Sequence, residues 1–165
     1  MSKRNYLKEL KDSTSDKYFK RYVPPDLTQK QKEETAKTLI LRREGKTDKE
    51  TKTYGRKPKQ SGFTKKFNDK YGYIENKSES NLAKIFRVPK KDIEDVYKRG
   101  YGAWTTSGSR LGVPREAWAK ARVYKYLLNV IKVREGGDPP KTQGGDRQEV
   151  INSAKNSKLI PKEKK

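Results

Sequence analysis

The clearest periodic pattern of apolar and polar positions lies between Pro114 and Glu135. At 3.6 residues per turn, apolar side chains recur on one face and its flank, with basic residues opposite. The apolar face contains Ala117, Ala121, Tyr124, Leu128 and Ile131. Its flank contains Val123, Leu127 and Val130. The opposite, basic side contains Arg115, Arg122, Lys125 and Lys132. Pro114 suits a first helical turn, and Gly136 suits a helix end. The pattern predicts the central helix of the core.

Shorter amphipathic patterns predict five further helices. Thr28 and Gln31 form a capping-box pattern, which indicates a helix over about 28–44. The others are expected from Ser61 to Gly72, from Ser80 to Pro89, from Pro89 to Gly100, and from Asp146 to about Ser157. No segment alternates in the manner of a strand, so the predicted fold class is mainly α.

Long basic extensions flank this small helical core. Residues 1–27 are expected to form an extended arm whose rings enter grooves of neighbouring proteins; the rings belong to Tyr6, Tyr18, Phe19 and Tyr22. Residues 28–62 are predicted to be a helix plus a basic linker, and residues 63–135 the helical core. Residues 136–165 are predicted to be a glycine- and proline-rich linker, a short helix and a charged tail. The basic linker and its continuation contain Arg56, Lys57, Lys59, Lys65 and Lys66.

Composition limits the size of the core. Leu, Ile, Val and Phe account for 29 of 165 residues, and the net charge is +21. Disorder is the usual expectation for that combination. Ten tyrosines and two tryptophans act in the other direction, because each ring can bury a large area. We therefore expect a compact helical part and extensions that become ordered against a partner.

The positive charge indicates an anionic partner. Residues 1–75 hold 21 basic and 11 acidic residues, and residues 76–165 hold 21 and 10, so the excess is not confined to one tail. A net charge of +21 exceeds the roughly 2 to 8 that keeps a small domain soluble. Nucleic acid, anionic lipid or an acidic protein surface would attract such a chain.

The sequence contains no cysteine and no histidine, which excludes several kinds of catalytic and metal-binding site. Without cysteine there is no disulfide, thiolate metal site or cysteine nucleophile, and without histidine the commonest general base and metal ligand is gone. No apolar run is long enough for a membrane span, and the first residues lack the apolar core of a signal peptide. We expect a non-enzymatic, intracellular protein with no cofactor, no metal and no transmembrane span.

The segment "RGYGAWTTSGSRLG" at 99–112 combines glycines, rings, hydroxyls and arginines. A phosphate-binding loop would need G-x-x-x-x-G-K-[ST], which this segment does not contain. A serine nucleophile would need a base in a recognisable arrangement, which is missing too. We expect a loop that packs as a structural corner and also serves as a docking edge, together with a stacked pair of Trp118 and Arg122. The structural and docking residues are Gly100, Gly102, Trp104, Ser107, Gly108, Arg110, Trp118 and Arg122.

The same segment supports a family resemblance. "GYGAWTTSGSRLGVPREAWAKARVYKYL", with "YVPPDLTQKQKEETAKTLI" and "GFTKKFNDKYG" upstream, resembles an uncharacterised basic protein family of phycodnaviruses and other nucleocytoplasmic large DNA viruses. Its pattern is roughly G-x-G-A-[YW]-x-[ST]-S-G-x-R followed by W-A-x-A-R. Matching positions are Gly100, Gly102, Ala103, Trp104, Thr106, Ser107, Gly108, Arg110, Trp118, Ala119, Ala121 and Arg122; Leu111 and Val113 depart from it. The resemblance implies a viral origin, and a virion component.

Two functions fit these observations. The first is a minor capsid protein, made in the host cytoplasm and located in the capsid interior, that cements neighbouring capsid proteins on the inner face of a shell. The alternative is a nonspecific DNA-binding or genome-packaging protein, favoured by the run from Lys46 to Lys66 with eight basic and two acidic residues. Neither needs a small-molecule substrate. Rings buried in protein neighbours would favour the first function, and a basic face open to phosphate would favour the second.

Overall fold

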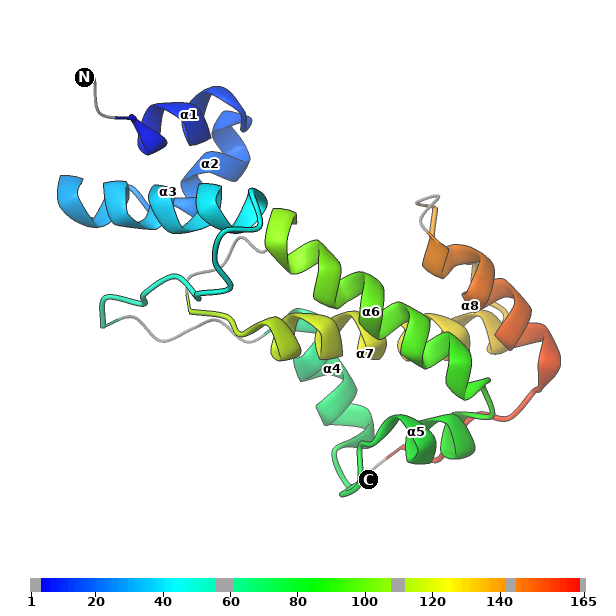
Figure 1. The fold of residues 1–165 in the computed structure, drawn as a ribbon. Coiled ribbons are helices and arrows are strands. Elements are labelled where there is room, and N and C mark those ends of the chain that lie inside the picture. Colours follow the sequence, from blue (N-terminus) through cyan, green and yellow to red (C-terminus); the bar gives the residue numbers. More distant parts are fainter. Residues whose placement is uncertain (1–3, 56–60, 108–111, 142–144, 164–165) are drawn as a thin grey trace. The chain divides into compact units, whose positions relative to one another are not determined.

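The computed structural model describes residues 4–55, 61–107, 112–141 and 145–163, with residues 106, 107 and 145 described in their backbone only. These residues form helices and no strand (Figure 1), so the prediction of a mainly α fold is confirmed. The helices are α1 (Tyr6–Asp12), α2 (Asp16–Tyr22), α3 (Gln29–Arg43), α4 (Gly62–Tyr71), α5 (Glu79–Phe86), α6 (Lys90–Ser107), α7 (Arg115–Arg134) and α8 (Gly145–Asn156).

The chain divides into two compact units. Unit 1 comprises Met1–Lys59 and Tyr101–Trp118, and unit 2 comprises Gln60–Gly100 and Ala119–Lys165. Each unit is described by itself below. Each has its own buried apolar cluster, so the hydrophobic residues of this chain serve two small cores.

In unit 1, α3 begins where its sequence predicts. The Thr28 hydroxyl accepts from the Gln31 backbone N–H at 3.2 Å, and the Gln31 side chain accepts from the Thr28 N–H at 3.0 Å. This reciprocal pair satisfies two backbone donors that a helix start leaves open. Leu39 and Ile40 on the buried face of α3 join the core of unit 1.

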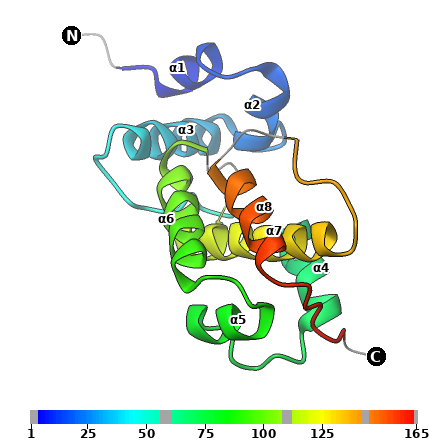
Figure 2. The same cartoon turned by 90° about the vertical axis from the view of Figure 1, so that its right-hand side faces the viewer.

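The extended arm predicted for residues 1–27 is wrong in the described residues. They form α1 and α2, and Figures 1 and 2 show α1 running beside α3. Leu10 and Val23 are fully buried against α3, and Tyr6, Phe19 and Tyr22 pack around them. A helix of seven residues is marginal alone. These two form because their apolar residues bury against the chain's own α3, where we expected a neighbouring protein.

In unit 2, α7 is the central helix, as its pattern predicts, but its buried face is displaced. Val123, Leu127 and Val130, expected on the flank, are buried, whereas Ala117 of unit 1 is exposed. Tyr126 is also buried, and its hydroxyl has a partner in the Ser153 hydroxyl of α8, 2.8 Å away. With α4, α6 and α8 all packed around it, α7 buries more than one stripe.

Aromatic rings form the centre of unit 2. The Phe67 ring of α4 stacks on the Tyr124 ring of α7 with 4.4 Å between centroids, and Phe86 packs against Phe67 and Tyr71 at 5.8 and 5.1 Å. Ser61 and Gly72 cap α4 as predicted. Phe63 and Phe67 are four residues apart, a spacing that predicts one apolar contact row, but only Phe67 is buried and Phe63 is exposed.

Two predicted boundaries need correction. Helix α5 is capped by Ser78, whose hydroxyl accepts from the Asn81 N–H at 3.3 Å, and so begins earlier than Ser80. Helix α6 does not end at Gly100 but continues to Ser107, so the predicted loop over 99–112 is helical in its first part. Glycine costs a helix about 1 kcal/mol relative to alanine without breaking it.

Gly100 has a packing reason to be glycine. Figure 2 shows α6 crossing α7, and a Cβ added at Gly100 would lie 2.9 Å from the Ala119 Cα and 3.3 Å from the Arg122 Cβ. No real side chain tolerates the first of these distances. The two helix backbones therefore approach closely because residue 100 has no side chain.

Candidate nucleic-acid interface

The sequence-predicted Trp104 is the centre of a buried cluster in unit 1. Its side chain is 1% exposed, and its indole N–H donates to the Val113 carbonyl at 2.9 Å. The Arg42 guanidinium of α3 lies over the ring with its Cζ 3.5 Å from the ring centroid, and Arg42 Nη2 donates to the Trp104 carbonyl at 2.6 Å. One arginine thus binds both the face and the backbone of Trp104.

A second arginine lies near the same ring. The Arg115 Cζ is 4.9 Å from the Trp104 centroid and 4.4 Å from that of Tyr101, and Arg115 Nη2 lies 3.2 Å from an Asp48 carboxylate oxygen. Burial, together with repulsion from Arg115 and Arg43, lowers the pKa of Arg42 to about 10. Arg42 therefore stays charged at neutral pH, and aromatic faces stabilise both guanidiniums.

In unit 2, Arg122, which the i,i+4 spacing pairs with Trp118, forms ion pairs. Arg122 Nε donates to Asp146 at 2.7 Å, and this carboxylate also accepts from Arg99 at 3.0 Å. Arg99 contacts Glu149 as well, at 2.5 Å. Arg122 thus binds the start of α8, where the sequence suggested a stack on Trp118. Acidic residues in the first turns of α8 also complement its dipole.

Arg134 at the end of α7 holds four backbone carbonyls. Its Nη1 donates to Phe86 at 2.5 Å and Leu159 at 3.0 Å, and its Nη2 donates to Arg87 at 2.9 Å and Ser153 at 2.8 Å. Phe86 ends α5, and Arg87 caps it in the left-handed conformation with φ of 49°. Arg134 therefore satisfies carbonyls that the end of α5 leaves without helical partners.

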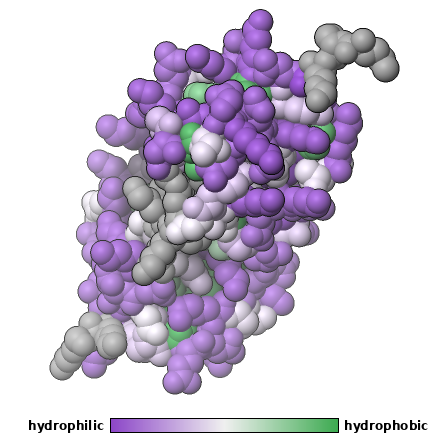
Figure 3. Space-filling model, turned by 90° about the vertical axis from the view of Figure 1, so that its left-hand side faces the viewer, coloured by the Kyte–Doolittle hydropathy of each residue, from purple (hydrophilic) through white to green (hydrophobic). Residues whose placement is uncertain are grey.

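Lysines and arginines occupy different environments. Among the described residues, 22 of 25 lysines are exposed, compared with three of ten arginines. Only Lys46, Lys70 and Lys90 lie within ion-pair distance of a carboxylate in that part of the chain. Figure 3 shows one face of the molecule, where hydrophilic side chains predominate and hydrophobic ones form small isolated areas. Most described arginines are therefore at least partly buried, and most described lysines are exposed to solvent.

The remaining sequence-predicted residues are distributed along the chain. Lys65 and Lys66 are exposed on α4, and Tyr18 is exposed on α2, whereas Tyr6, Phe19 and Tyr22 pack in unit 1. Gly102 lies in α6 with open space beside it. Ser107 ends α6, and Trp118 is partly buried in α7. The predictions for Arg56, Lys57, Lys59, Gly108 and Arg110 concern residues outside the described ranges.

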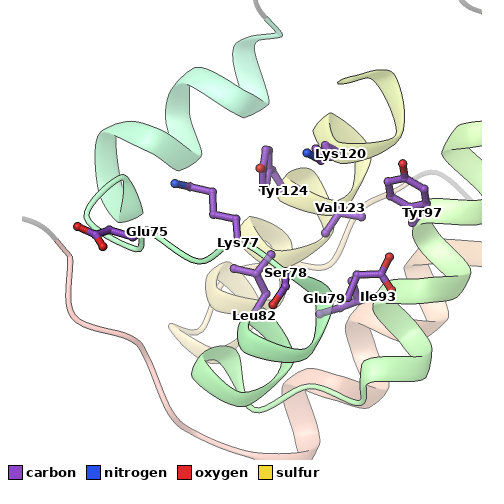
Figure 4. Close-up of a pocket in the computed structure, with 10 residues that line it drawn as sticks. All are labelled: Glu75, Lys77, Ser78, Glu79, Leu82, Ile93, Tyr97, Lys120, Val123 and Tyr124. Carbon is purple, nitrogen blue, oxygen red and sulfur yellow. The ribbon is translucent and has the colours of Figure 1, made fainter. Parts of the chain in front are cut away.

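Two cavities of about 480 Å³ each lie within single units. In unit 2, Figure 4 shows Tyr97, Lys120 and Tyr124 around an apolar floor that includes Val123 and Leu82. At its edge, Lys77 Nζ donates to the Ile74 carbonyl at 2.7 Å, and Ser78 caps α5. The cavity of unit 1 lies between α1 and α3 and is lined by Arg4, Tyr6, Lys30, Glu33, Glu34 and Lys37, among others.

The described part of the chain offers neither a metal-binding cluster nor a membrane-spanning helix. It contains no group of three or more acidic side chains placed to hold a metal ion. None of its helices combines the length and apolar character needed to cross a membrane.

Sequence reasoning missed the partners of the predicted residues. Arg42 lies 62 positions from Trp104, and Asp146 lies 24 positions from Arg122, so no local pattern connects them. One signal was present. Arg42 falls on the apolar side of α3, next to Leu39, where a solvated arginine would not be expected.

Comparison with known proteins gives one match. The model of a family described as "Family of unknown function (DUF5824)" matches residues 5–143, which include both units' helices from α1 to α7. No curated protein and no solved structure matches the chain. The match covers most of the sequence, and the chain therefore belongs to the DUF5824 family of unknown function.

Proposed function

We propose that this protein binds nucleic acid through the phosphate backbone, without reading base sequence. The observation that carries the proposal is the difference in exposure between the two basic side chains. Most described lysines are exposed, whereas most described arginines make contacts inside the units. Direct reading of guanine typically uses the two-pronged guanidinium, whereas an ammonium acts as a point charge suited to phosphate. A lysine surface therefore favours affinity without specificity.

The charge of each unit supports the same proposal. Unit 1 contains 20 basic and 10 acidic residues, and unit 2 contains 22 and 11. Because most described lysines have no carboxylate within ion-pair distance, their charge is available to an external anion. Each phosphate that such a lysine neutralises releases condensed counterions, which makes the binding strongly dependent on salt.

The test is fluorescence anisotropy with labelled 20-base-pair duplexes of several unrelated sequences, at 50 and 200 mM salt. We expect similar affinities for all sequences and a loss of about 10³-fold or more between the two salt concentrations if six or more phosphates are contacted. Absence of binding at 50 mM salt, or a preference above about tenfold for one sequence, would overturn the proposal.

A minor capsid protein of a large DNA virus is our second proposal. Tyr18 supports it, because this ring of the predicted arm is 48% exposed on α2 and open to a neighbouring protein. The resemblance of residues 100–122 to proteins of large DNA viruses also supports it, because that resemblance implies a virion component. In fractionated virions, retention with empty shells above about 0.5 M salt would favour the capsid role, because phosphate contacts are weak there. Release with the genome at moderate salt would favour DNA binding.

A further inference from the structure

Phe63 is an exposed apolar ring on a helix whose other rings are buried. It lies in the first turn of α4 and is 44% exposed, whereas Phe67 and Tyr71 of the same helix are fully buried. The exposed tyrosines of this chain have a polar hydroxyl to offer water, and the Tyr73 hydroxyl also donates to the Lys162 carbonyl. Phe63 has no polar atom, so its exposure to water is unfavourable.

One lysine contacts this ring, and two others lie on the same faces of α4 and α7. The Lys125 Nζ of α7 lies 5.2 Å from the Phe63 ring centroid, a distance at which cation and ring attract each other. Lys66 is exposed on α4 three residues after Phe63, which places both side chains on one side of the helix. Lys132 is exposed on α7 seven residues after Lys125, on the same helical face. All four residues belong to unit 2.

Among the described residues, no carboxylate lies within ion-pair distance of Lys66, Lys125 or Lys132. The patch thus combines an exposed aromatic ring, contacted by Lys125, with ammonium groups that have no carboxylate partner among the described residues. Proteins that bind single strands without sequence preference use this combination, since bases stack on the rings and the phosphates meet the cations.

We propose that Phe63, with Lys66 and Lys125, is a base-stacking site, so that the protein binds single-stranded nucleic acid more tightly than duplex. A base on the ring takes the place of the Lys125 ammonium, which then contacts the adjacent phosphate. In a duplex the base faces are already stacked on each other and cannot reach Phe63. This inference rests on the proposed function, because the same lysines supply the phosphate contacts.

The experiment uses the full chain with a labelled 20-nucleotide oligo-dT and a labelled 20-base-pair duplex at one salt concentration. We expect tighter binding of oligo-dT. Phe63→Ala should weaken oligo-dT binding about fivefold or more and leave duplex binding within about twofold, because stacking contributes about 1–3 kcal/mol per base. Phe63→Trp should retain oligo-dT binding, since it keeps a stacking face.

Two controls separate stacking from charge and from loss of an exposed apolar group. Lys66→Gln should lower the affinity for oligo-dT and for the duplex to a similar degree, because it removes a phosphate contact. Ile160→Ala removes a side chain that is 43% exposed in the same unit and is aliphatic, so it should change neither affinity. Circular dichroism of each variant verifies the fold.

The outcomes distinguish this inference from the proposed function. Equal affinity for both ligands, or a Phe63→Ala variant that binds oligo-dT like the wild type, would overturn the stacking site and leave phosphate binding intact. A wild-type protein that binds neither ligand would overturn both. If Phe63→Ala instead weakens binding only to anionic lipid vesicles, the patch is a lipid contact and the inference is wrong.

Discussion

At the scale of single residues, the two basic side chains of this protein have different structural roles. Guanidiniums hold Trp104, the start of α8 and the end of α5, through stacking, ion pairs and carbonyl contacts. Their planar, multiply donating shape suits such contacts, whereas an ammonium has a single charged centre. Replacing one of these arginines by lysine therefore keeps the net charge and removes the geometry.

Arg134 gives the sharpest test of this distinction. We expect Arg134→Lys to lower the free energy of unfolding by about 1–3 kcal/mol, because one ammonium cannot serve four carbonyls on three segments. Urea unfolding followed by circular dichroism measures the shift. The control is Lys132→Arg at an exposed position of the same helix, which should leave the midpoint unchanged. Equal midpoints for the two variants would show that Arg134 is only a surface charge.

At the scale of helices, the approach of α6 to α7 depends on one absent side chain. Gly100→Ala should lower the free energy of unfolding by about 1–3 kcal/mol, because the added methyl group meets the backbone of Ala119 at 2.9 Å. Helix propensity alone predicts the opposite, a gain of about 1 kcal/mol.

Gly102 offers a matched control in the same helix. A Cβ there has nothing within 4 Å, so Gly102→Ala should be neutral or stabilising. Thermal unfolding of both variants tests the pair. If Gly100→Ala proves as stable as Gly102→Ala, the two helices have room to separate and the close approach does not limit the fold.

Local sequence signals predicted the helices whose ends are marked by capping residues in the sequence. The capping box at Thr28 and the caps at Ser61 and Gly72 were correct, because they depend on residues only a few positions apart. α1 and α2 were missed, since seven-residue helices exist only through contacts with α3. The second half of α6 was missed because glycine usually ends a helix, and here it permits a crossing.

The candidate interface was predicted only in part. Net charge indicated an anionic partner but does not separate lysine from arginine, whose different burial follows from contacts between distant segments. Trp104 was expected in the core and is buried there, yet its partner Arg42 lies too far away in sequence for any pattern to reveal it. The spacing of Phe63 from Phe67 fits a buried row, and this local pattern does not reveal that the Phe63 ring is exposed.

At the scale of the whole molecule, the charge is almost equal in the two units, with excesses of +10 and +11. Nonspecific binding to duplex should therefore use lysines of both. We expect two quadruple lysine-to-glutamine variants to reduce the salt dependence of duplex binding by similar amounts, up to about 3.6 in the slope of log K against log salt. Their positions are Lys17, Lys20, Lys30 and Lys37 in unit 1, and Lys84, Lys91, Lys98 and Lys155 in unit 2.

Anisotropy titrations over a range of salt concentrations measure both slopes. The two variants have the same net charge, so any difference between them reflects location. A reduction confined to one variant would contradict binding by both units and assign the interface to a single unit.

The division between guanidiniums held in internal contacts and exposed amines also has a chemical consequence. Acylating reagents, and enzymes that acetylate lysine, neutralise amines and leave guanidiniums unchanged. Such a modification would remove most of the surface charge while the contacts of Arg42, Arg99, Arg122 and Arg134 stayed in place. If the proposed function is correct, each neutralised lysine would lower the affinity for nucleic acid by a step, and neither unit would unfold.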